Sequence, residues 1–182
     1  MVGVFTFVSG NLALDFAGTV KERDTGFVDL LTTPGALDEW LVAAGLLDRA
    51  PGCATTDFTD AVALREAVYR LAVTATTGEP WHDADRELVN RTARAPKPVL
   101  GLRSDGGIDR GGGCDNALAL IATEAIELLG GPDRARIKQC GRDACTRLYL
   151  DTSRAGSRRW CDMTLCGNRA KSASFRARHG EQ

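Results

Sequence analysis

Residues 140–171 read CGRDACTRLYLDTSRAGSRRWCDMTLCGNRAK and hold four of the six cysteines of the chain. These four form two Cys-x4-Cys pairs, Cys140 with Cys145 and Cys161 with Cys166, and fifteen residues separate the pairs. A structural zinc ion takes four ligands, usually in two pairs that tight turns bring together. The spacing therefore predicts one structural Zn²⁺ bound by four thiolates. Because the segment has few apolar residues, we expect its fold to depend on the metal.

Two other interpretations of the four cysteines remain open at this point: a pair of disulfides, or a redox or catalytic cysteine pair. The N-terminal residues lack the basic region of a signal peptide, and no run of about 18 apolar residues follows, so we expect a cytoplasmic protein without a membrane segment. In a reducing cytosol, disulfides are rare. Cys53 and Cys114 lie outside the pattern and are interpreted as small buried residues.

The residues around the second cysteine pair predict a short hairpin followed by a helix. Residues 147–160 alternate apolar and polar side chains around a Ser-Arg-Ala-Gly turn, which indicates a hairpin that returns Cys161 to Cys145. Asp162 is suited to cap a helix over the residues that follow, which Gly167 weakens.

The rest of the chain predicts a mainly α-helical body. Apolar residues recur at helical spacing, and the residues at the ends of these runs are good helix caps and breakers. A β-hairpin is expected over 99–110, around an Asp-Gly-Gly turn. We place a domain boundary at Gly130-Gly131-Pro132, so that 1–131 is a helical domain, 132–182 is a zinc finger, and each has its own core. Helices are expected over 10–20, 33–45, 57–76, 82–94 and 115–129.

Charge is distributed unevenly along the chain. Residues 134–182 hold 12 of the 23 Lys and Arg but four of the 24 Asp and Glu, so their net charge is +8, against −9 for the remainder. A basic segment that is shaped by a metal suggests binding to a polyanion. The alternatives are a solvated charged surface, or a module that docks on another protein or on the acidic body of its own chain.

The helix after Cys161 carries cations on two flanks with small residues between them, as a groove-binding helix would. Duplex DNA is the expected partner, because the segment lacks the exposed aromatic residues of many RNA-binding surfaces. An enzyme is not expected, since His82 and His179 belong to no catalytic arrangement in the sequence. The candidate DNA-binding residues are Arg158, Arg159, Asn168, Arg169, Lys171, Arg176 and Arg178.

Three polar residues interrupt the apolar faces of the helical body. Asn11 and Asp15 lie one helical turn apart, and Arg65 lies on the apolar face of the longest helix. Asp15 and Arg65 are interpreted as a buried ion pair between two helices, or, together with Asn11, as a patch that binds a small-molecule effector. The sequence does not set the oligomeric state.

The segment from Cys140 to Arg178 resembles the CGNR zinc finger, whose namesake motif is Cys166-Gly167-Asn168-Arg169 in this chain. The N-terminal GNLALDFAGT, residues 10–19, resembles the opening of the ABATE domain, the mostly helical partner that usually precedes this finger. The resemblance implies zinc bound by the same four cysteines and a stress-related transcription regulator of bacteria. DNA binding by the finger is also an expectation from the resemblance.

Overall fold

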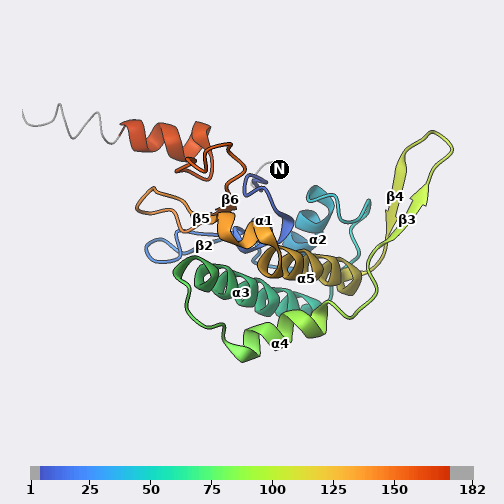
Figure 1. Ribbon diagram of the computed structural model, residues 1–182. Helices are drawn as coiled ribbons and strands as arrows, with labels where there is room; N and C mark the ends of the chain where they lie inside the picture. The colour runs from blue at the N-terminus through green and yellow to red at the C-terminus, as the bar shows by residue number, and fades with distance from the viewer. Residues whose placement is uncertain (1–4, 173–182) are drawn as a thin grey trace, which may run out of the picture.

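The computed structural model describes residues 5–172, and its architecture is mainly α with short antiparallel hairpins (Figure 1). In chain order the helices are α1 (Leu12–Ala17), α2 (Pro34–Ala43), α3 (Thr55–Thr77), α4 (Asp83–Thr92) and α5 (Cys114–Gly130). The strands are β1 (Val20–Lys21), β2 (Val28–Asp29), β3 (Val99–Leu102), β4 (Ile108–Gly111), β5 (Ile137–Gln139) and β6 (Leu148–Leu150). A 3₁₀ turn (Pro132–Arg136) follows α5, and a π-helical turn (Met163–Gly167) continues as helix over 168–172.

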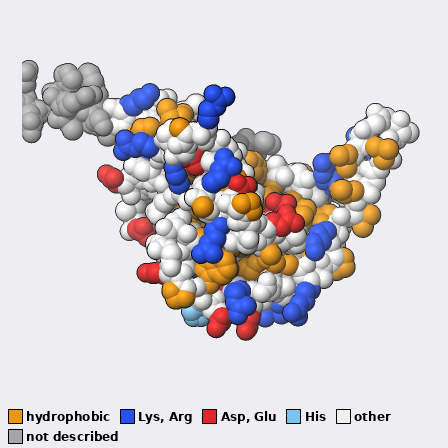
Figure 2. Space-filling view, in the orientation of Figure 1, with side chains coloured by type: hydrophobic (Ala, Val, Ile, Leu, Met, Phe, Trp, Pro, Cys, Tyr) orange, Lys and Arg blue, Asp and Glu red, His pale blue; other side chains and the backbone are white. Residues whose placement is uncertain are grey.

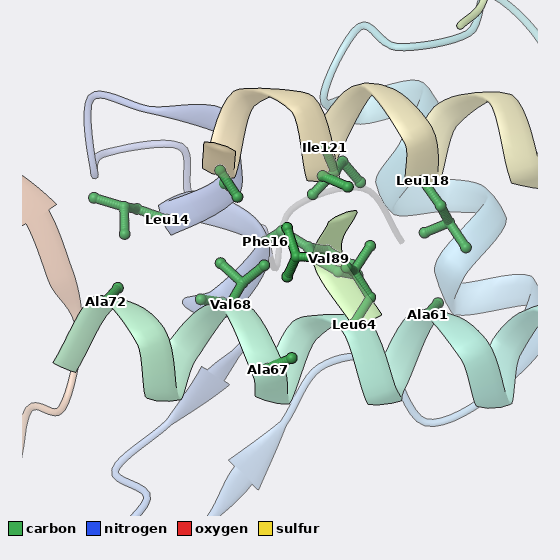
Figure 3. Close-up of a cluster of buried hydrophobic side chains, with 14 of the residues drawn as sticks. Leu14, Phe16, Ala61, Leu64, Ala67, Val68, Ala72, Val89, Leu118 and Ile121 are labelled. Carbon is green, nitrogen blue, oxygen red and sulfur yellow. The ribbon is translucent and has the colours of Figure 1, made fainter. Parts of the chain in front are cut away.

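Helices α3 and α5 lie side by side, and α1 and α4 contact both of them (Figure 1). Figure 3 shows Leu64 and Val68 of α3 facing Leu118 and Ile121 of α5, with Phe16 of α1 between the two helices. All five side chains are buried. Burying one such side chain contributes about 1.5–3 kcal/mol, so this layer supplies much of the stability of the helical body. No helix in residues 5–172 is both long enough and apolar enough to cross a membrane.

Local signals in the sequence account for the ends of the helices. The Thr33 hydroxyl accepts a hydrogen bond from the Ala36 amide at the start of α2, with Pro34 in the first turn. Gly78 ends α3 in the left-handed conformation, which glycine adopts without strain. The predicted helix over 10–20 is shorter than expected, because the chain leaves α1 after Ala17 and enters β1 at Val20.

The structure corrects the predicted hairpin over 147–160. Strand β6 pairs antiparallel with β5, which precedes the first cysteine pair, in the register Ile137 with Leu150 and Gln139 with Leu148. After β6 the chain turns instead of continuing as a strand, because the Asp151 carboxylate accepts hydrogen bonds from the backbone amides of Ser153 and Arg158 at 2.9 and 3.2 Å.

Strand β6 contributes side chains to two hydrophobic cores. Leu148 and Leu150 belong to the main hydrophobic core, whereas Tyr149 between them packs with the four cysteines. Successive side chains of a strand point to opposite faces. One face of the β5–β6 hairpin therefore completes the helical core, while the other supports the cysteine cluster. The boundary at 131/132 stays a prediction.

An ion pair between α3 and α4 predicts a measurable dependence of stability on pH. Asp85 is buried, and its carboxylate accepts two hydrogen bonds from the guanidinium of Arg70, at 2.8 and 2.5 Å. These bonds hold the pKa of Asp85 below its usual value. A depressed carboxyl pKa stabilises the fold above the unfolded pKa of about 4 and ceases to do so as pH falls through the folded pKa.

We therefore expect Asp85→Asn to lower the free energy of unfolding by roughly 1 kcal/mol at pH 7, the scale of a partly exposed charge-assisted pair. The difference from the wild type should shrink as the pH falls below about 4. Urea unfolding at pH 7 and pH 3 measures both values. Asp83→Asn is the matched control, because the Asp83 side chain is exposed and its pair with Arg86 spans one helical turn. Equal losses in the two variants would contradict the prediction.

Candidate metal centre and basic groove

The four predicted ligand cysteines converge in the structure. The sulfur atoms of Cys140, Cys145, Cys161 and Cys166 all lie within 4.8 Å of one another, and all four residues are buried. The Sγ atoms of Cys145 and Cys161 are 3.8 Å apart, and those of Cys161 and Cys166 are 3.6 Å apart. A disulfide needs about 2.05 Å, so these cysteines are free thiols. The disulfide interpretation is wrong.

Hydrogen bonds of the backbone place each cysteine pair. The amide of Cys145 donates to the Arg142 carbonyl oxygen at 2.7 Å, which closes a tight turn between the first two ligands. The Asp162 carboxylate accepts from the Leu165 amide at 2.6 Å and so caps the π-helical turn that carries Cys166, as predicted. The Cys161 amide also donates to the Cys140 sulfur, at 3.5 Å.

The electrostatics of the cluster require a cation if all four thiols are to ionise. The pKa of Cys145 is lowered because the Cys140 and Cys161 thiols donate hydrogen bonds to its sulfur. The pKa of Cys161 is raised because its hydrogen bonds to Cys140 and Cys145 retain its proton. Four buried thiolates at these separations would repel one another strongly without a positive ion between them.

The donor set fits zinc. Four sulfurs at about 2.3 Å from a tetrahedral Zn²⁺ lie about 3.8 Å from one another, close to the separations that the structure shows. Cysteine thiolates select soft or borderline ions, and a closed set of four leaves no position for a substrate. The cluster is therefore a metal site, and its geometry is that of a structural ion.

The sequence places Arg158 among the DNA-binding residues. In the structure its guanidinium instead binds backbone segments around the cysteine cluster. Its Nε donates to the Trp160 carbonyl oxygen at 2.9 Å, and its Nη2 donates to the carbonyl oxygens of Val8, at 3.0 Å, and of Cys161. The guanidinium also lies 4.5 Å from the centroid of the Tyr149 ring. With its donors bound to backbone carbonyls, Arg158 has a structural role, and we remove it from the DNA-binding set.

Arg147 is a residue that the sequence interpretation missed. Its side chain is buried, and its Nη2 donates to the Thr6 hydroxyl at 2.8 Å and to the Gly18 carbonyl oxygen at 3.1 Å. Its Nη1 lies 3.6 Å from the Asp15 carboxylate. Arg147 comes two residues after a metal ligand, so it connects the cysteine cluster to the N-terminal part of the helical body. The only sequence signal for this role was a basic residue at the start of a stretch in which apolar and polar side chains alternate.

The surface beside the cysteine cluster carries a wide groove of about 1080 Å³, which we call the basic groove. Figure 2 shows Lys and Arg side chains over this part of the molecule. Four of the seven candidate DNA-binding residues line the groove and are exposed, namely Arg159, Asn168, Arg169 and Lys171. Arg176 and Arg178 lie outside the described residues. The charged and polar groups of the lining are Arg142, Asp143, Arg159, Thr164, Asn168, Arg169, Lys171 and Ser172.

The three residues considered for an effector site have different partners in the structure. Asn11 caps α1, accepting from the amides of Ala13 and Leu14. Asp15 accepts from the amides of Val8 and Ser9 at 3.0 and 2.9 Å. The predicted Asp15–Arg65 ion pair is wrong, because the partners of Asp15 are the backbone amides of Val8 and Ser9 and the side chain of Arg147, which immediately precedes β6. Arg65 instead forms a bidentate pair with Asp29, at 2.7 and 2.9 Å, and contacts Glu66.

Among the described residues, the walls of the basic groove and of four other hollows do not include Asn11, Asp15 or Arg65. Each of the three side chains makes protein contacts, and a small-molecule site at these residues stays a prediction. Their role in the described structure is to cap α1 and to hold its neighbouring segments in place.

Comparison with known families agrees with this architecture. The family model ABATE, described as "Putative stress-induced transcription regulator", matches residues 10–132. The model of the CGNR zinc finger matches residues 136–179 and includes all four clustered cysteines. No match is found among curated proteins. The chain therefore belongs to the ABATE family, and a CGNR zinc finger follows the ABATE region within it.

Proposed function

We propose that this protein is a regulator that binds duplex DNA through the basic groove, and that a structural Zn²⁺ held by the four cysteines shapes this groove. The observation that carries the proposal is the composition of the groove: Arg159, Arg169 and Lys171 line it against one acid, Asp143, together with Arg142, which pairs with Glu22. The resulting excess of positive charge suits a nucleic-acid backbone.

The metal determines where these cations lie. Cys166 lies in the π-helical turn that leads directly into residues 168–172, so an ion bound to its sulfur would anchor the start of the helix that carries Asn168, Arg169 and Lys171. The exposed amide of Asn168 is suited to reading a base edge, whereas the cations are suited to phosphates.

The ion pairs of the finger separate two groups of cations. Arg142 pairs with Glu22 at 2.9 Å, and Arg147 is buried against Asp15, so these two hold the finger on the helical body. Within residues 5–172, Arg159, Arg169 and Lys171 have no ion-pair partner. Self-docking thus accounts for Arg142 and Arg147, whereas Arg159, Arg169 and Lys171 line the groove. This division supports DNA binding over the alternative, a zinc-stabilised module that binds only proteins.

The proposed activity is binding and not catalysis. A closed four-thiolate site offers no open coordination position, so the metal has a structural role in this proposal.

A salt titration tests the proposal. Each phosphate that the protein neutralises contributes about −0.9 to the slope of log affinity against log salt. For the zinc-loaded full chain and a mixed-sequence duplex, we expect a slope of roughly −3 to −4. Arg169→Ala should weaken binding to all sequences and reduce the slope by about one unit. Asn168→Ala should leave the slope nearly unchanged and lower the discrimination between sequences.

Arg86→Ala is the matched control, because Arg86 is also an exposed helical arginine but lies on α4, away from the finger (Figure 1). It should leave the slope unchanged. Absence of binding at low salt, or equal effects of Arg86→Ala and Arg169→Ala, would refute the proposal and favour the protein-binding alternative.

A further inference from the structure

The β3–β4 hairpin is an arm that stands away from the helical body (Figure 1). Hydrophobic side chains follow it, as Figure 2 shows. Val99, Leu100 and Leu102 are 73%, 68% and 85% exposed, and Ile108 is 45% exposed. Contiguous apolar surface of this kind marks an interaction site on a folded protein.

The register of the hairpin gathers three of these side chains on one face. Leu102 pairs with Ile108, and Leu100 pairs with Arg110. Cross-strand partners share a face, and residues two apart in a strand share a face. Leu100, Leu102 and Ile108 therefore lie together on one face, which we call the arm face, and Arg110 lies on the same face at the root of the arm, beside Asp48. Val99 lies on the opposite face.

The arm is held in a defined shape. At the tip, the Arg103 amide donates to the Gly107 carbonyl oxygen at 2.8 Å, and Gly106 takes the left-handed conformation that the turn requires. At the root, the Asp48 amide donates to the Arg110 carbonyl oxygen at 3.0 Å, and the Arg110 amide donates to the Asp48 carboxylate at 2.9 Å. A preorganised arm loses little conformational entropy when it binds.

The charges of the arm favour a second copy over nucleic acid. Residues 99–111 carry two arginines and two aspartates, so their net charge is zero. Arg103 pairs with Asp105 in the arm, and Arg110 lies 3.9 Å from Asp48. An arm without net charge has no electrostatic attraction for phosphates and does not repel another arm. The outer part of the arm face, formed by Leu100, Leu102 and Ile108, is apolar and can pack against its own copy, while Arg110 at the root lies beside Asp48.

We propose that the arm face is a dimer interface, in which Leu100, Leu102 and Ile108 of one copy pack on the same residues of a second copy around a twofold axis. Such a contact is isologous, as in most homodimers. The six side chains bury on the order of several hundred Å², and with the strand backbones the contact approaches the lower limit of about 1,200 Å² for specific interfaces. We therefore expect a dimer that dissociates in the micromolar range.

Sedimentation equilibrium of the zinc-loaded full chain, from about 1 to 500 μM, tests this proposal. The weight-average mass should rise with concentration from 19.5 kDa towards twice that value. Leu102→Lys should keep the chain monomeric over the whole range, because it places two like charges in the apolar contact.

Val99→Lys is the matched control. Val99 lies in the same strand with similar exposure but on the opposite face, so its variant should dimerise as the wild type does. Circular dichroism should be the same for all three proteins, since both substituted side chains are exposed. A wild-type chain that stays monomeric at 500 μM, or equal weakening by both substitutions, would overturn the proposal. The DNA titration is independent of this result, because the arm and the basic groove share no residue.

Discussion

Replacing Cys161 by serine should remove the metal from the protein and unfold the finger. Elemental analysis should find one zinc ion per wild-type chain and close to none in the variant. The expected effect is large, because zinc contributes about 10–16 kcal/mol of apparent binding free energy to small finger folds near pH 7. The core around the metal holds little else, namely the four cysteines and Tyr149, with Trp160 partly buried against them.

The loss of order should extend beyond the cysteine cluster. Leu148 and Leu150 are part of the main core, and the Leu150 amide donates to the Ser9 carbonyl oxygen at 2.7 Å. Hydrogen exchange in the Cys161→Ser chain should therefore accelerate in the finger, in β6 and in the segment before α1. The amides of α3 and α5 should keep most of their protection, because those helices pack mainly on each other and on α1 and α4.

Cys53→Ser is the matched control for the metal. Cys53 is half-buried at the edge of the main core and lies outside the cluster, so this variant should keep its zinc ion. Full zinc content in Cys161→Ser would contradict the four-cysteine assignment. Unchanged exchange before α1 would contradict the coupling between the finger and the helical body.

Arg147→Ala should destabilise the zinc-loaded protein by about 3–5 kcal/mol, as expected when one partner of a buried, hydrogen-bonded charge pair is removed. Asp15 remains behind in the variant. Burial already raises the pKa of Asp15, although Arg147 and the amides of Ser9 and Val8 act in the opposite direction. Without Arg147 the buried carboxylate loses its nearest cation. Urea unfolding of the zinc-loaded chains at pH 7 gives the free energies.

A double-mutant cycle separates this charge effect from lost packing. Asp15→Asn in the Arg147→Ala background should recover about 1 kcal/mol or more, because it removes the uncompensated charge. Arg86→Ala is the surface control and should change stability by less than about 0.5 kcal/mol. A loss below about 1 kcal/mol for Arg147→Ala would contradict the prediction and show that the Arg147–Asp15 pair contributes little to the attachment of the finger.

Local patterns were sufficient for much of the secondary structure and for the metal site. The helix expected over 57–76 is α3 at 55–77, and the one expected over 115–129 is α5 at 114–130. Periodicity and caps act within a few residues, so they can be read from the chain directly. The two Cys-x4-Cys pairs are equally local, because each tight turn sets the distance between its two sulfurs.

Pairings between distant segments could not be read in this way. Apolar and polar side chains alternate over residues 147–160 as they would in a hairpin, but this alternation does not identify the strand with which a given strand pairs. In the structure β6 pairs with β5, because that register places Leu148 and Leu150 in the main core and Tyr149 beside the metal site.

What the sequence by itself determined is therefore the mainly helical class, the positions of the helices and the four metal ligands. The tertiary structure decided which cations remain available to a partner. Arg158 and Arg147 looked like other basic residues of the finger, yet both are engaged with the body, more than 120 positions away in the sequence. The need for glycine at position 18 also follows from the tertiary structure, since an added Cβ would lie 2.7 Å from Nη1 of Arg147. The physical reason is desolvation: a charge loses its hydration only where the assembled fold supplies acceptors, and those come from segments that the folding of the chain brings together.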